Sequence, residues 1–148
     1  MDQYSVFDVA KWFLSKEALT PKKIQKLTYY AEAWSYALLD KSLLNDTNFE
    51  AWVHGPVSPI LYDKYKEYRW NKIPKTTAPV VFDEQVTDLL ESVWATYGDK
   101  SANELEALTH VETPWKQARQ GCSEYDSSSQ PIDPELMKSY YRSIYIGG

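Results

Sequence analysis

The apolar residues of this chain recur mainly at spacings of three and four, which is the period of an α-helix. Ser5 is suited to cap a first helix from Val6 to about Lys16, and Thr20-Pro21 is suited to open a longer second helix. The second helix has two apolar stripes on nearly opposite sides, formed by Ile24, Leu27, Ala31, Trp34 and Leu38, and by Tyr29, Ala33 and Tyr36. Such a helix is typical of the centre of a fold or of a surface that a partner covers.

Five further helix starts are marked by a capping residue, in most cases followed by proline: Ser58-Pro59, Asp83, Ser101 with Glu104 as a capping box, Thr113-Pro114 and Asp133-Pro134. Residues 40–48 and 69–82 are expected to be irregular, and residues 120–131 to form a flexible polar loop before the C-terminal helix. Residues 49–54 alternate weakly, which allows at most a short β segment. We therefore expect a mainly α, compact single-domain bundle of about six or seven helices over residues 1–148.

Aromatic residues are numerous for a chain of 148 residues, with six Trp, twelve Tyr and four Phe. One core of this size has limited room, so we expect some of them to be exposed, and exposed Tyr and Trp are frequent in protein-binding hot spots. The net charge of −5 opposes broad binding to nucleic-acid backbones, because such binding needs a basic surface. The same charge would attract a basic protein partner.

The compartment is indicated by the single cysteine, Cys122, which cannot form an intrachain disulfide and suits a reducing cytoplasm. The N-terminal stretch lacks the basic region and long apolar core of a secretory signal. No apolar run approaches the roughly 18 residues of a membrane-spanning helix. We expect a cytoplasmic protein with no membrane segment.

The two histidines, His54 and His110, are the main candidates for chemistry. With Glu50 or Glu112 they could in principle bind a metal, but the local ligand pairs that zinc sites show are absent. Glycine-rich phosphate loops are also absent, and no nucleophile with a nearby base is marked out by its spacing. We expect both histidines to hold backbone turns in a protein that is not an enzyme and uses no metal or cofactor.

An alternative function is suggested by residues 5–38, in which a helix, a short turn and a second helix resemble a helix-turn-helix of a DNA-binding regulator. The second helix carries Lys22, Lys23 and Lys26 in its first turns. We favour an ordinary helical hairpin, because aromatic rather than polar residues follow these lysines and because the acidic total opposes approach to DNA.

Candidate partner contacts lie in two places. Tyr29 and Tyr36 belong to the shorter apolar stripe of the second helix, and Trp70 and Lys72 lie in the irregular segment 69–82. If both tyrosines are buried within the monomer, the helix is central and the contact surface lies elsewhere.

Four segments of the chain resemble the Panacea domain, the SocA-like antitoxin family also found as phage-associated proteins: VFDVAKWFLSK, LTPKKIQKLTYYAEAWSYAL, FEAWVHGPVSPILYDKY and LTHVETPWKQAR. The resemblance runs from about Tyr4 to Arg119. It implies a mainly α-helical fold and the antitoxin half of a toxin–antitoxin pair of bacteria and their phages. The implied activity is neutralisation of a cognate toxin by direct contact, or delivery of that toxin to a protease.

The motifs that carry the resemblance concentrate polar and aromatic groups at two breaks in the chain. We expect these residues to form a shared pocket with a structural or functional role: Trp52, His54, Gly55, Pro56, Thr109, His110 and Trp115. No catalytic role follows from the resemblance for any of them.

Overall fold

The computed structural model describes residues 3–77, 81–123 and 125–147. These residues form seven α-helices, one 3-10 helix and one two-stranded antiparallel hairpin: α1 (Val6–Leu14), α2 (Pro21–Leu39), β1 (Glu50–Trp52), β2 (Gly55–Val57), α3 (Pro59–Tyr65), η1 (Lys66–Tyr68), α4 (Glu84–Tyr97), α5 (Ala102–His110), α6 (Thr113–Ala118) and α7 (Pro134–Gly147). The prediction of a mainly helical fold is confirmed. The β segment expected near residues 49–54 is present, and residues 55–57 return beside it as a second strand, with Trp52 opposite Gly55.

The predicted helix starts are confirmed where a side chain caps the helix. Ser5 accepts a hydrogen bond from the Phe7 amide at 3.1 Å, and Ser101 and Glu104 form a reciprocal capping box at 3.0 and 2.8 Å. The last helix is longer than predicted, because it continues beyond Ser143 to Gly147. None of the helices in the described part of the chain combines the length and the apolar character that crossing a membrane requires.

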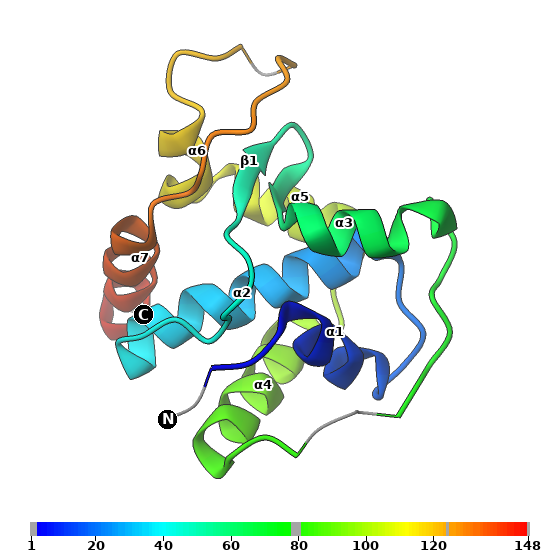
Figure 1. Cartoon of the computed structure of the whole chain (residues 1–148). Helices are drawn as coiled ribbons and strands as arrows, with labels where there is room; N and C mark the ends of the chain where they lie inside the picture. Colours follow the sequence, from blue (N-terminus) through cyan, green and yellow to red (C-terminus); the bar gives the residue numbers. More distant parts are fainter. Residues whose placement is uncertain (1–2, 78–80, 124, 148) are drawn as a thin grey trace.

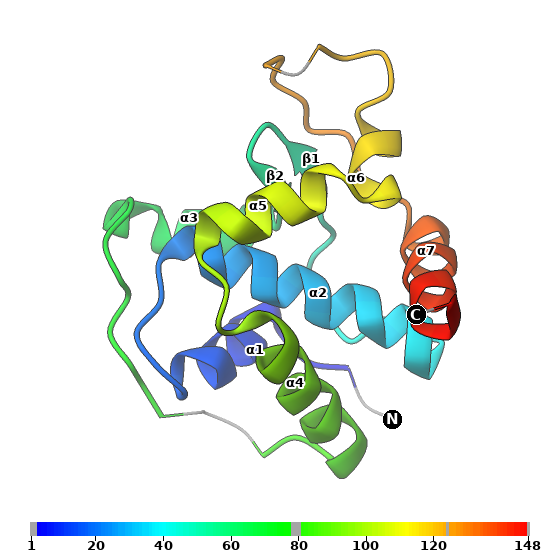
Figure 2. The same ribbon diagram turned by 180° about the vertical axis from the view of Figure 1, so that it is seen from behind.

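Helix α2 runs through the middle of the fold (Figures 1 and 2). Helices α1 and α4 lie on one side of it, the hairpin, α3 and α5 lie on the other, and α7 packs against its C-terminal half. Tyr29 is only 1% exposed and Tyr36 is half-buried, so both apolar stripes of α2 are largely covered by the rest of the chain. The two-sided helix is therefore central, and the expectation that Tyr29 contacts a partner is wrong for the folded monomer.

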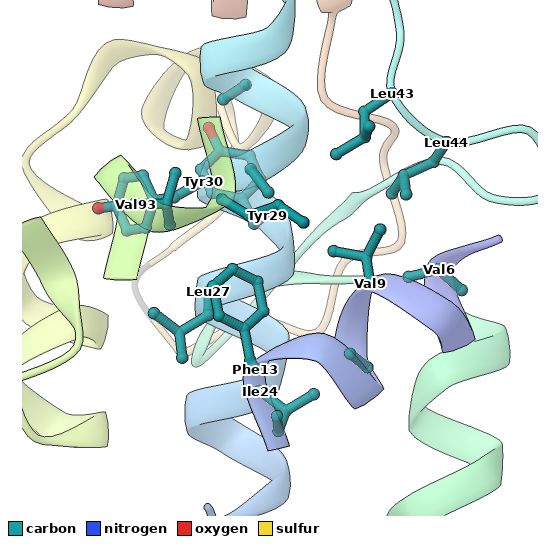
Figure 3. Close-up of a cluster of buried hydrophobic side chains, with 14 of the residues drawn as sticks. Val6, Val9, Phe13, Ile24, Leu27, Tyr29, Tyr30, Leu43, Leu44 and Val93 are labelled. Carbon is teal, nitrogen blue, oxygen red and sulfur yellow. The ribbon is translucent and has the colours of Figure 1, made fainter. Parts of the chain in front are cut away.

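The main apolar core forms where α1 crosses α2. Figure 3 shows side chains from α1, α2, α4 and the loop after α2 (residues 40–48) that point toward one another. They include Val9, Phe13, Leu27, Leu43 and Val93. These residues are at most 2% exposed. The burial of several large apolar side chains stabilises this junction, at roughly 1.5–3 kcal/mol for each.

Helix α2 also buries polar side chains, and several of them have a partner in another part of the chain. The Gln25 amide donates to the Ser58 carbonyl at 3.0 Å and accepts from the Ser58 amide at 2.8 Å. The Glu32 carboxylate accepts from the Leu43 amide at 2.6 Å. These pairs hold the start of α3 and the segment after α2, because a buried polar group left unpaired is costly.

A third set of buried polar side chains, formed by Tyr30, Tyr141 and Glu112, links α2 to the start of α6. The hydroxyls of Tyr30 and Tyr141 both donate to Oε1 of Glu112 at 2.8 Å. Tyr30 in turn stacks on Tyr97, with ring centroids 3.9 Å apart. Burial raises the pKa of Glu112 to about 7, although the two hydroxyl donors act in the opposite direction.

The Glu112→Gln variant tests this buried carboxyl. The folded chain binds the Glu112 proton more tightly than the unfolded chain, so the stability contributed by this group falls as the pH rises from the ordinary glutamate range to about 7. Gln stays neutral and keeps an oxygen for both tyrosines. In urea denaturation, the variant should gain on the order of 2 kcal/mol relative to wild type between about pH 5 and about pH 8. If the unfolding free energies of the variant and the wild type change in parallel with pH, Glu112 is already charged at low pH.

Candidate functional site

A cavity of about 740 Å³ lies between the N-terminal half of α2, the hairpin and the α3–η1 segment. Its lining includes residues of α2, the hairpin, α3–η1 and the loop that precedes α7: Lys22, Gln25, Lys26, Trp52, His54, Val57, Leu61, Tyr62, Tyr65, Lys66, Arg69 and 127–129. The volume falls in the range of sites that bind small ligands or peptide side chains.

Lys26 lies at the base of this cavity and is only 1% exposed. Its ammonium donates a hydrogen bond to the Pro56 carbonyl at 3.2 Å. Burial, together with the nearby Lys22 charge, lowers the pKa of Lys26 to about 7, although Glu106 acts in the opposite direction. An ammonium group that is buried in this way is rare unless it has a partner, so its position is a specific feature of the site.

The second strand can pass close to Lys26 only because residue 55 is glycine. Gly55 has a φ of 113°, and a Cβ atom at this position would lie 2.6 Å from Cε of Lys26 and 3.0 Å from Oγ1 of Thr109. The backbone conformation therefore favours glycine, and a Cβ atom could be placed here only if the end of the Lys26 side chain shifted. Gly55, Pro56 and Thr109 thus lie together beside Lys26.

Glu106, on α5, pairs with two residues that line the cavity, His54 and Lys22. One carboxylate oxygen accepts from Nδ1 of His54 at 3.1 Å, and the other pairs with the Lys22 ammonium. Partial burial raises the pKa of Glu106, but the interactions with Lys22 and His54 outweigh this effect and hold the pKa below the ordinary value. The sequence interpretation missed Glu106, although it precedes Thr109 and His110 by one helical turn and shares their face of α5.

The second histidine lies beside a smaller hollow of about 360 Å³, whose lining includes His110, Trp115, Arg119 and Cys122. The His110 ring stacks on Trp115 at 4.0 Å, and the Trp115 indole donates to the Trp52 carbonyl at 2.8 Å. Partial burial lowers the pKa of His110, against the opposing effect of Glu106. The expected pocket residues thus meet at the hairpin, but His54 and His110 line separate hollows.

The expected surface contacts do not come together. Trp70 is 77% exposed and Lys72 is also exposed, directly after η1. Tyr36 lies near the opposite end of α2, and Tyr29 is in the core. Only the Trp70 region is therefore both exposed and adjacent to the main cavity, through Arg69.

The lysines of the expected helix-turn-helix face their own chain. Lys22 pairs with Glu106, Lys23 donates to the Gly98 carbonyl at 2.6 Å, and Lys26 is buried. A recognition helix needs an open polar face to enter the major groove. Helix α2 is largely covered on both sides, which argues against its use as a recognition helix.

Comparison with known proteins assigns most of the chain to a family. The family model described as antitoxin SocA-like, Panacea domain, matches residues 24–116. The matched region runs from the first turn of α2 into α6 and includes Lys26, the hairpin, Glu106 and His110. No curated protein and no solved structure matches the chain significantly.

The Gly55→Ala variant tests the close approach of the second strand to Lys26. Gly121 is the matched control, because it has a φ of 91° and a Cβ atom there would meet no other atom within 4 Å. Gly121→Ala should cost about 1–2 kcal/mol of unfolding free energy from backbone strain alone. Gly55→Ala adds a clash in a packed region, so its loss should be larger by about 1–3 kcal/mol in chemical denaturation. Equal losses would mean that Lys26 shifts aside without cost.

Proposed function

Because the chain belongs to the SocA-like antitoxin (Panacea) family, we propose that it is an antitoxin-type binding module that neutralises a cognate toxin by direct protein–protein contact. The observation that carries the proposal is the family match, which covers residues 24–116 and thus the hairpin and most of the residues that line the main cavity. Membership of an antitoxin family implies a toxin as the partner.

An exposed group of aromatic side chains supports binding to a protein. Tyr62, Tyr68 and Trp70 are 44, 38 and 77% exposed and follow one another along α3, η1 and the next turn. We call them the aromatic edge. Tyr and Trp dominate the energetics of protein interfaces because they bury a large area with few rotatable bonds. The aromatic edge lies beside the main cavity, because Tyr62 and Arg69 line that cavity.

Two modes of neutralisation are compatible with docking of a toxin on this side of the molecule. The bound chain would either cover the active surface of the toxin or deliver the toxin to a protease. The lifetime of the toxin separates the two modes: occlusion leaves a stable complex, and delivery shortens the half-life of the toxin when the chain is co-expressed.

The direct test is co-expression with the product of the reading frame adjacent to the gene. That product should arrest growth alone and be harmless together with this chain. Replacing Tyr68 and Trp70 by Ser should weaken binding of the purified pair by at least about 30-fold, as expected for loss of interface hot spots. Growth should then no longer be protected.

The matched control is Tyr145→Ser, because Tyr145 is 63% exposed on α7, which lies on the other side of the molecule from α3 (Figure 1). This variant should protect as well as wild type. Loss of protection in both variants, or in neither, would contradict the use of the aromatic edge. Adjacent products that are all harmless when expressed alone would contradict the antitoxin function itself.

A further inference from the structure

The main cavity has a charge opposite to that of the whole protein. The chain has 21 acidic and 16 basic residues, yet the described residues that line the cavity include no Asp or Glu and include four Lys or Arg: Lys22, Lys26, Lys66 and Arg69. A concave surface lined by cations within an otherwise acidic protein favours an anionic group over the rest of the surface.

Two of the four cations are available to an incoming anion. Lys22 is paired with Glu106, and Lys66 forms an exposed ion pair with Asp63 at 3.4 Å. The Arg69 side chain, by contrast, has no hydrogen-bond or ion-pair partner within the described segments.

The second cation is Lys26. Its ammonium has three N–H donors, and the structure shows one of them bonded to the Pro56 carbonyl. It is buried at the base of the cavity, where a carboxylate would interact more strongly than at the surface.

The walls of the cavity are apolar and aromatic. Val57, Leu61 and Tyr65 are at most 7% exposed and form the inner part, while Trp52 and Tyr62 contact each other with ring centroids 5.0 Å apart. A purely ionic ligand would leave this apolar surface exposed to water. A ligand that fits both features has an apolar body and a carboxylate.

We propose that this cavity is the socket for a segment of the toxin in which an aromatic or aliphatic side chain stands beside a carboxylate. The carboxylate would interact with Lys26 and Arg69, and the apolar side chain would pack between Leu61 and the Trp52–Tyr62 pair. The inference rests on the antitoxin function proposed above and adds the chemistry of the partner segment.

A protein segment is favoured over a free small acid because the cavity opens beside the aromatic edge. A chain that entered the cavity would continue over exposed Tyr68 and Trp70, so one interface would include both features. The net charge of −5 still attracts a basic toxin at long range, since steering depends on the whole surface and the socket depends on local contacts.

Three matched peptides test the proposal with the full chain: acetyl-Leu-Phe-Asp-Leu-amide and its Asn and Lys analogues. Titrations followed by NMR should show shifts of the Trp52 indole and of the Val57 and Leu61 signals. The Asp peptide should bind about tenfold more tightly than the Asn peptide, since hydrogen bonds to charged groups are stronger, and the Lys peptide should bind most weakly.

Variants of the two cations complete the test. Arg69→Gln and Lys26→Met should each abolish the preference for Asp over Asn, and Lys41→Met, which removes an exposed lysine elsewhere, should preserve it. Arg69 is exposed, so its variant remains informative even if Lys26→Met fails to fold. Equal affinity for the Asp and Asn peptides, or shifts confined to residues outside the cavity, would overturn the proposal.

Two further measurements separate this inference from the proposed function. Tight binding of free 1-naphthylacetate, stronger than that of the Asp peptide, would overturn the peptide assignment in favour of a small-molecule site. If Arg69→Gln loses the peptide preference but protects cells from the toxin fully, the socket is wrong and the antitoxin function stands. If the peptide preference is present but no adjacent product is neutralised, the antitoxin function fails and only the chemistry of the cavity remains.

Discussion

A buried helix that carries polar side chains must find partners for them, and this requirement organises the fold around α2. Gln25 holds both backbone groups of Ser58, Lys26 holds the Pro56 carbonyl, and Glu32 holds the Leu43 amide. Tyr30 reaches Glu112 at the start of α6. Each of these bonds positions a different segment of the chain against α2, because breaking it would leave a buried polar group without a partner.

The cavity is a consequence of this arrangement. The hairpin and the start of α3 are held over the first turns of α2 by Gln25 and Lys26, and the hairpin is linked to α6 by the bond from the Trp115 indole to the Trp52 carbonyl. The space left between these elements is lined by their apolar residues and by the lysines of α2. The features that stabilise the fold and those proposed to bind a partner are therefore adjacent but mostly different: Gln25 and Gly55 position the site, whereas Arg69 and the aromatic edge are exposed.

The helices could be predicted from the sequence because their signals are local. Caps, prolines and apolar spacing mark each start, and the family motifs indicated that the segments of His54 and His110 meet. Burial of individual residues on α2 could not be predicted in the same way. Lys26 follows two other lysines in the first turns of α2 and would be expected at the surface, and its burial depends on strand residues thirty positions later. Tyr29 and Trp70 are both aromatic, and only tertiary packing decides that one is in the core and the other in solvent.

Hydrogen exchange of the Gln25→Leu variant measures most directly whether the polar groups of α2 hold the site in place. Gln117→Leu is the control, since Gln117 is exposed on α6 and its side chain donates a local hydrogen bond to Gln120. In Gln25→Leu, the amides of residues 55, 57, 58, 60 and 61 should exchange at least about tenfold faster, because the Ser58 amide loses its acceptor and the Ser58 carbonyl keeps only the Tyr62 amide, while amides of α4 and α7 keep their protection. Unchanged exchange at Ser58, or an equal loss of protection throughout the chain, would contradict the central role of these bonds.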